Sequence, residues 1–271
     1  MNKAQILAIY DVIKKRPPHI VAFGGGVDST AMILGLYESS RPIDLILFAD
    51  TGGERPETYA HIENFSKWLT SKGLPEITIV RKVRKDGSLE TLEQECHRRN
   101  NLPSIAYGFK SCSQKHKIAP QDKFLNHWTP AMQWWETGAK CVKYIGYDAG
   151  ESHRAENAAK RNDPKYDYKY PLIEWQWDRQ DCLDIIAKHG INNVGKSACF
   201  FCPSSRPKEI IDLYEKHPDL AQRALDIEKQ AELTSIKGLG RNYAWSDVIL
   251  MHKSQMTLPF VGFDLPCECT E

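Results

Sequence analysis

The stretch IVAFGGGVDSTAMILGL, which covers Ile20–Leu36, decides the fold that the sequence predicts. Its first part is a short apolar run that ends in three glycines, as a buried strand often does. From Asp28 onward the apolar residues have the spacing of a helix. Glycines let a backbone approach a phosphate closely, and a helix N-terminus supplies N–H donors and the positive end of its dipole. The stretch therefore predicts a strand, a phosphate-binding loop and a helix.

The loop in this stretch matches neither GxGxxG nor GxxxxGK[ST], so both of those phosphate-binding signatures are disfavoured. Ser29 and Thr30 add hydroxyl groups at the start of the helix. The alternative interpretation is that the glycines serve packing alone, because they also permit tight turns without a ligand. The expected phosphate contacts come from Phe23, Gly24, Gly25, Gly26, Asp28, Ser29 and Thr30.

Apolar runs and helical patterns alternate along the first half of the chain. The expected strands are His19–Phe23, Ile43–Ala49, Glu76–Val83 and Val142–Tyr147. The expected helices are Gln5–Lys15, Asp28–Tyr37, Glu57–Thr70, Ser88–Arg99, Trp128–Thr137, Asp148–Lys160 and Asp178–Lys188. This alternation predicts an α/β fold, an open parallel sheet flanked by helices with right-handed crossovers.

The pattern changes near residue 190. We take residues 1–190 as a nucleotide-binding α/β domain, and residues 191–271 as a segment with a CxxC pair, helices and a cysteine-containing tail. Helices are expected at Pro207–Glu215 and Leu220–Leu233, followed by irregular chain from Lys237.

The composition is that of an ordinary globular protein. The chain has 271 residues, of which 41% are hydrophobic and 26% charged, enough to bury a sizeable core. A net charge of +1 gives no general attraction to nucleic acid, although a local basic patch stays open. No apolar run has the length of a membrane span, and residues 1–10 lack the apolar block of a signal peptide. We therefore expect a cytoplasmic protein without a membrane partner.

Eight cysteines in such a chain favour metal binding or redox chemistry over disulfides. The candidates for this chemistry are the CxxC pair Cys199 and Cys202, the CxC pair Cys267 and Cys269, and Cys112 in a basic stretch. Cys182 lies on the apolar face of an expected helix and is interpreted as core. Cys96 and Cys141 have no partner nearby in the sequence and are also interpreted as structural.

The glycine loop resembles the SGGxDS loop of the adenine nucleotide alpha-hydrolase (PP-loop) superfamily. Gly24 replaces the first serine of that motif, so its hydroxyl contact to phosphate is absent. Three further segments resemble the PAPS (phosphoadenosine phosphosulfate) reductase branch: DTG with PET at Asp50–Thr58, Gly146–Arg154, and Tyr170–Trp175. The resemblance spans about residues 19 to 205. It adds these nucleotide-binding candidates: Asp50, Thr51, Gly52, Glu57, Thr58, Gly146 and Arg154.

The cysteine pattern resembles the C…CxxCP set of iron–sulfur members of this branch. The resemblance implies a [4Fe–4S] cluster at Cys112, Cys199 and Cys202. The fourth position is closed by Cys267, or else by Cys269 or Cys141, or it stays open. Zinc is the alternative, because it accepts cysteine and histidine ligands. The tail thiol Cys269 lies where PAPS reductases carry a mobile catalytic cysteine.

Three functions fit these motifs. In the first, ATP is cleaved between its α and β phosphates, an acceptor is adenylated, and sulfur then displaces AMP; Asp28 and Asp50 would hold Mg²⁺ and Arg154 would stabilise phosphate charge. In the second, a thiolate of Cys267 or Cys269 attacks the sulfur of PAPS or APS, and sulfite is released. In the third, the chain is a metal-stabilised nucleotide-binding module without catalysis.

The partners follow less directly from the sequence. The acceptor is DNA, tRNA or a metabolite, and a sulfur donor protein or a thiol reductant would supply the second substrate. Trp128, Trp134 and Trp135, beside Lys140 and Lys143, suit base stacking or, more commonly, core packing. The sequence gives no indication of the oligomeric state.

Overall fold

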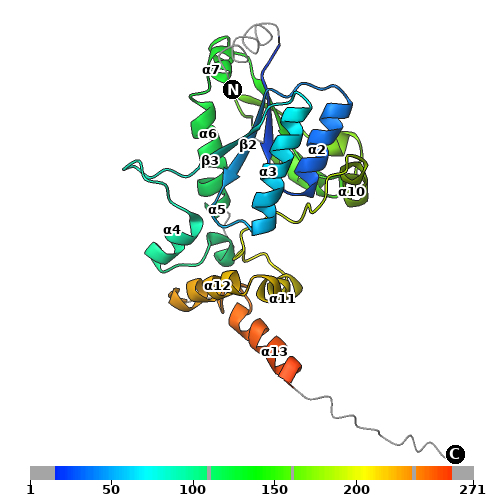
Figure 1. Ribbon diagram of the computed structural model, residues 1–271. Coiled ribbons are helices and arrows are strands. Elements are labelled where there is room, and N and C mark those ends of the chain that lie inside the picture. The colour runs from blue at the N-terminus through cyan, green and yellow to red at the C-terminus, as the bar shows by residue number, and fades with distance from the viewer. Residues whose placement is uncertain (1–15, 109–110, 160–161, 234–235, 258–271) are drawn as a thin grey trace, which may run out of the picture. The chain divides into compact units, whose positions relative to one another are not determined.

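The computed structural model describes residues 16–108, 111–159, 162–233 and 236–257 (Figure 1). The expected helix Gln5–Lys15 and the tail cysteines Cys267 and Cys269 lie outside this part. The described residues of Met1–Glu95 and Lys110–Cys199 form one compact unit, and those of Cys96–Phe109 and Phe200–Glu271 form a second. This division falls after Cys199 and groups Cys96–Phe109 with the C-terminal part; the functional boundary near residue 190 stays a prediction.

The first unit is built on a five-stranded parallel sheet. Its strands are β1 (His19–Phe23), β2 (Leu45–Asp50), β3 (Ile77–Arg81), β4 (Cys141–Ile145) and β5 (Tyr166–Lys169). Their order is β3-β2-β1-β4-β5, and every pairing is parallel. The predicted α/β class is therefore confirmed. The order reverses between β1 and β4, and in such sheets the carboxyl ends of the strands at this reversal form the ligand-binding crevice.

Two layers of helices cover this sheet (Figure 1). On one face lie α2 (Val27–Glu38), α3 (Pro56–Ser71) and α10 (Arg179–Lys188), which pack on alternate strand residues such as Val21 and Phe23. On the other face lie α6 (Ala119–Leu125) and α7 (Thr129–Glu136), which cover Ile20 and its neighbours. Because both faces are covered, every residue of β2 is buried, as its continuous apolar run predicts.

The remaining helical segments are shorter or lie in the second unit. They are α4 (Leu92–Arg99), η1 (Ser104–Tyr107), α5 (Ser111–Ser113), η2 (Gln114–Ile118, a π-helix), η3 (Ala149–Glu151), α8 (Ser152–Ala159), α9 (Pro171–Glu174), α11 (Pro207–Lys216), α12 (Pro218–Gln230) and α13 (Trp245–Thr257). No described helix is long and apolar enough to cross a membrane.

The expectation that the chain is irregular from Lys237 was wrong, because α13 lies there. The carboxylate of Glu228 in α12 accepts hydrogen bonds from the backbone N–H groups of Trp245 and Ser246 at 2.8 and 3.0 Å, and so satisfies the start of this helix. Trp245 is itself fully buried. The cap comes from another helix, so the local sequence does not reveal it.

The expected start of a helix at Ser88 was also wrong. A turn held by the Asp86 carboxylate, which accepts from the Ser88 N–H at 3.0 Å, brings Val83 and Leu89 into an antiparallel bridge. The helix α4 therefore begins only at Leu92. The strand β5 was not expected either, because its sequence YDYK has no apolar run.

Gly35 gives a test of the packing of α2. A Cβ atom at this position would lie 2.8 Å from Cη2 of Trp175 and 3.0 Å from Cη2 of Trp177. Alanine normally stabilises a helix by about 1 kcal/mol relative to glycine, but overpacking a filled core costs about 1–3 kcal/mol. We therefore expect Gly35→Ala to lower the free energy of unfolding in urea. The matched control is Gly195→Ala, where a Cβ meets nothing within 4 Å; equal stability of both variants would contradict this packing.

Candidate functional site

The glycine loop lies at the carboxyl end of β1, between Phe23 and the first residue of α2. Gly25 has φ +77, in the left-handed region that favours glycine. A Cβ atom there would lie 3.2 Å from Cγ2 of Thr58 and 3.3 Å from Cε2 of Phe48. Both the turn and the lack of space therefore require glycine at this position.

The hydroxyl groups of Ser29 and Thr30, at the start of α2, contact the backbone of the glycine loop. Ser29 Oγ accepts from the Gly24 N–H at 3.2 Å and lies 3.1 Å from the carbonyl oxygen of Gly26. Thr30 Oγ1 lies 2.9 Å from the same carbonyl oxygen. No described side chain caps the helix at Gly26. Because the N–H groups of a first helical turn have no partner within the helix, an anion is the natural cap here.

His61 on α3 contacts the first turn of α2. Its Nε2 lies 3.0 Å from Oγ1 of Thr30, and its ring stacks on Phe65 with centroids 5.5 Å apart. Burial lowers the pKa of His61 to about 4, so the ring is neutral at pH 7. The sequence gave no reason to select this residue.

Asp28 and Arg179 form an ion pair at the mouth of the loop, with Oδ1 and NH1 2.7 Å apart. Burial raises the pKa of Asp28, and the Arg179 cation opposes this shift. The negative charges of Asp148 and Glu151 raise the pKa further. Arg179 is the first residue of α10, and its guanidinium group lies beside Asp28 in the first turn of α2. Arg179 was not among the predicted site residues.

Asp50 ends β2, and the protein itself engages both of its carboxylate oxygens. Oδ1 accepts from the Gly52 N–H at 2.7 Å and from the Tyr59 hydroxyl at 2.8 Å, and Oδ2 accepts from Nε of Arg81 at 2.8 Å. Burial, followed by this contact with Asp50, raises the pKa of Tyr59. Asp50 thus holds the loop after β2 in place, and Mg²⁺ could bind it only by displacing these donors.

Of the remaining predicted residues of the DTG…PET motif, some are buried and one is exposed. Thr51 and Thr58 are buried, and Gly52 adopts φ +74 against Thr91. Glu57 is exposed in the first turn of α3, where a negative charge favours the helix dipole.

Gly146 and Arg154 follow β4. A Cβ atom at Gly146 would lie 3.1 Å from Cα of Ser29, so this glycine lets the end of β4 pack directly on the start of α2. Arg154 forms an ion pair with Glu151 and lies over the ring of Tyr147 at 4.1 Å from its centroid. Tyr147 stacks in turn on Tyr170. The Arg154 side chain thus packs on Tyr147, which stacks on Tyr170 and follows the end of β4 by two residues.

Cys199 lies directly beside the loop that follows β2. Its Sγ is 3.1 Å from Oγ1 of Thr51, and its backbone forms an antiparallel bridge with Glu54. Two residues earlier, the Ser197 hydroxyl donates to the carbonyl oxygen of Gly24. The segment before the CxxC pair therefore packs against the glycine loop, and it places a buried thiol at the carboxyl end of the sheet.

Of the other described cysteines, Cys96, Cys141 and Cys182 are buried, and Cys112 and Cys202 are partly exposed. Cys182 and Cys141 are fully buried, and burial raises the pKa of each thiol to about 12, which confirms the core interpretation of Cys182. Cys112 lies half-buried in α5, and Cys202 belongs to the second unit. The described residues contain no group of three or more His, Cys, Asp or Glu side chains that fits a metal ion. Cys112 and Cys202 belong to different units, and Cys267 lies outside the described residues, so the [4Fe–4S] cluster and its zinc alternative stay predictions.

The tryptophans support the packing interpretation. Trp128, Trp134 and Trp135 pack against the core beneath α6 and α7. Trp134 and Trp135 also donate through Nε1 to the backbone carbonyl groups of Lys140 and Lys165.

Comparison with known families identifies the class. The family model described as the phosphoadenosine phosphosulfate reductase domain matches residues 18–194, so the chain belongs to that family, as its motifs predict. No curated protein matches the chain.

Two solved structures are similar to the chain at 15% sequence identity and a TM-score of 0.43. One is phosphoadenylyl-sulfate (PAPS) reductase from Candida auris in a phosphate complex, with 69% of this chain and 80% of that chain covered. The other is the U34-tRNA thiolase NcsA from Methanococcus maripaludis with its [4Fe-4S] cluster, with 86% of this chain and 82% of that chain covered.

The pKa of His61 gives a test of the site. The folded-state pKa of about 4 lies below the ordinary value of 6.5, so the folded protein favours the neutral ring. Its contribution to stability is complete above pH 6.5 and is lost as the pH falls toward 4, at about 1.4 kcal/mol for each unit of pKa difference. We expect NMR to show His61 titrating near pH 4, and His61→Gln to weaken the acid dependence of unfolding. A titration near pH 6.5 would contradict the buried contact with Thr30.

Proposed function

We propose that this chain is an enzyme that binds ATP at the glycine loop and uses it to activate an acceptor for sulfur transfer. The observation that carries the proposal is the pairing of two features at one end of the sheet. The uncapped start of α2 suits a polyphosphate, and the Cys199 thiol is in contact with the loop after the neighbouring strand β2. Membership of the PAPS reductase family supports an adenine nucleotide as the ligand.

The loop residues would bind the β and γ phosphates through backbone N–H groups at the start of α2. Arg179 and Arg154 would add positive charge; both are at least two-fifths exposed, so an anion can reach them. Asp28 is the better candidate than Asp50 for contact with Mg²⁺, because both oxygens of Asp50 already accept hydrogen bonds from the protein. When bound, Mg²⁺ would neutralise phosphate charge.

The chemistry has two steps. An oxygen of the acceptor attacks the α phosphorus, the α–β phosphoanhydride bond breaks, and pyrophosphate leaves into the loop. Hydrosulfide, or the outer sulfur of a donor's persulfide, then attacks the activated carbon of the acceptor, and AMP leaves with the oxygen. In the persulfide case the donor stays attached through an S–S bond, and a thiol reductant breaks this bond and releases the sulfurated acceptor. The role of this chain is to hold the nucleotide and to stabilise the charge that develops on pyrophosphate. DNA, tRNA and a small metabolite all remain candidate acceptors.

The second candidate function is reduction of PAPS or APS, and the family match favours it specifically. A thiolate would attack the sulfur of the nucleotide sulfate, and the adenosine phosphate would leave. A second thiol would then release sulfite and form a disulfide. The tail thiols Cys267 and Cys269, which were predicted for this role, lie outside the described residues.

Product analysis separates these functions. The purified chain is incubated anaerobically either with ATP, Mg²⁺ and candidate acceptors, or with PAPS and dithiothreitol. Pyrophosphate and AMP in equal amounts are the expected products of ATP. Sulfite from PAPS would establish the second candidate instead, and nucleotide binding without either product would leave a non-catalytic module.

Asp28→Asn provides the site-specific control. We expect it to lower pyrophosphate release about tenfold or more, because it removes a carboxylate beside the phosphate loop. The matched control Asp184→Asn changes an aspartate on α10 whose partner is Gln180, and it should leave the rate unchanged. Equal rates in the two variants would place the reaction away from the glycine loop.

A further inference from the structure

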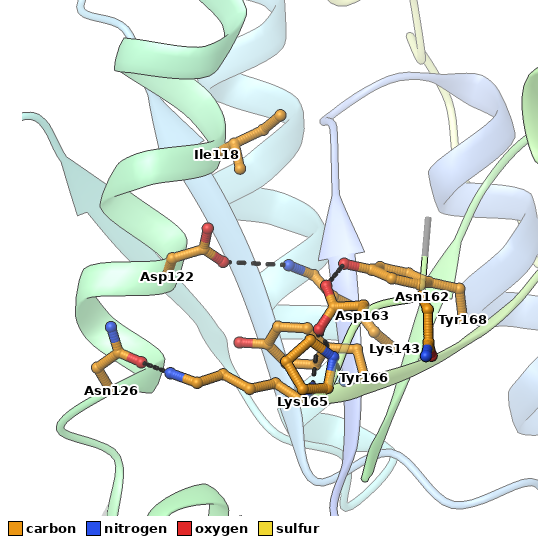
Figure 2. Close-up of a pocket in the computed structure, with 10 residues that line it drawn as sticks. Ile118, Asp122, Asn126, Lys143, Asn162, Asp163, Lys165, Tyr166 and Tyr168 are labelled. Atoms are coloured by element: carbon orange, nitrogen blue, oxygen red, sulfur yellow. Dashed lines mark hydrogen bonds and ion pairs between the residues drawn. The ribbon is translucent and has the colours of Figure 1, made fainter. Parts of the chain in front are cut away.

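A cavity separate from the residues of the glycine loop lies beside α6, β4 and β5, and Figure 2 shows the side chains that line it. It has a volume of about 390 Å³, which suits a small ligand. Its walls include residues of α6, of strand β4, of the edge strand β5 and of the segment 162–165. The residues that carry the argument are Asp122, Asn126, Lys143, Asp163, Lys165 and Tyr166.

Lys143 brings an amine into this cavity from the middle of β4. Its side chain is only 7% exposed, and that side chain lines the cavity. The nearest acidic group is Asp122, with Nζ and Oδ1 3.9 Å apart, longer than a hydrogen bond. On the other side, Nζ lies 4.8 Å from the ring centroid of Tyr166. The amine is therefore removed from water without a close ion pair.

The neighbouring polar groups are paired with one another, as Figure 2 shows. Asp163 accepts from the Tyr168 hydroxyl and from the Lys165 N–H, both at 2.8 Å. The ammonium group of Lys165 donates to the Asn126 side chain at 2.6 Å. The carboxylate of Asp122 is 43% exposed, and its contact with Lys143 is the one ion pair that it forms with the described residues. Among the described residues that line the cavity, the Lys143 amine and the Asp122 carboxyl group thus approach each other without a close ion pair.

Burial shifts the pKa values of the Lys143 amine and the Asp122 carboxyl group in opposite directions. It lowers the pKa of Lys143, against the opposing charges of Asp122 and Asp163. It raises the pKa of Asp122, against the charges of Lys143 and Lys165. Burial also raises the pKa of Tyr166, so this phenol stays protonated. A less protonated amine beside a more readily protonated carboxyl group is the combination that addition to a carbonyl carbon requires.

We propose that Lys143 is the nucleophile of a second site, where it forms an imine with a small aldehyde or ketone and Asp122 transfers the protons. The amine nitrogen attacks the carbonyl carbon and gives a carbinolamine. Protonation of its hydroxyl by Asp122 lets water leave, and the C=N bond forms as the nitrogen loses its remaining proton. The overall change is amine plus carbonyl to imine plus water, with no oxidant or reductant. The site does not depend on the function proposed for the glycine loop.

Reductive trapping tests the nucleophile on the wild-type chain. Glycolaldehyde with sodium cyanoborohydride at pH 7 converts each imine to a stable hydroxyethyl amine, because hydride adds to carbon and a solvent proton to nitrogen. Peptide mass spectrometry then compares Lys143 with the exposed Lys123 and Lys140. We expect labelling of Lys143 to be at least about tenfold faster. Labelling no faster than at the exposed lysines would overturn the proposal and leave Lys143 as a structural residue.

Asp122→Asn separates the proton-transfer role from a merely structural one. Acetylation by N-hydroxysuccinimidyl acetate needs an unprotonated amine but no proton donor, so the variant should keep this reaction at Lys143. Imine formation should fall about tenfold or more, because it needs the donor. A variant in which both reactions at Lys143 change by the same factor would overturn the role of Asp122.

Discussion

The packing of the end of β4 on the first turn of α2 is the contact on which the candidate site depends. Gly146 has room for no more than a hydrogen against the backbone of Ser29, and Gly25 turns the chain through a left-handed conformation against Thr58 and Phe48. These two glycines fix where the helix N-terminus lies relative to the carboxyl ends of β1 and β4. A larger side chain at either position would move the N–H groups at the start of α2, where we propose that phosphate binds.

The same packing explains how the loop functions without the first serine of its family motif. Ser29 and Thr30 hold the loop through Gly24 and Gly26, and His61 supports Thr30. Because these hydroxyls already maintain the loop, the proposed phosphate contacts are backbone N–H groups and nearby cations. Gly24 itself is held from outside by the hydroxyl of Ser197. The loop of this chain therefore keeps its internal hydrogen bonds with glycine in place of the first serine of the motif.

The sequence predicted the central part of the fold and failed where contacts are distant in the chain. β1 was predicted at its observed bounds, because a short apolar run before three glycines has few other uses. β5 was missed, because an edge strand with alternating Tyr and charged residues has no apolar run. Arg179 contacts Asp28 across 151 positions, and Cys199 contacts Thr51 across 148. No local spacing reveals such pairs, so the sequence predicted the glycine loop and selected Cys199 as a candidate metal ligand, but it indicated neither Arg179 nor the contact of Cys199 with Thr51.

The measurement that tests the central claim most directly is amide hydrogen exchange with and without ATP and Mg²⁺, followed residue by residue. If the nucleotide binds at the glycine loop, exchange of the amides in residues 24–30 slows about tenfold or more at saturation, with a smaller effect in residues 50–53. Exchange in residues 162–169, beside the cavity that Lys143 lines, stays unchanged. Unaltered exchange in residues 24–30 at a nucleotide concentration that saturates the protein would contradict the account.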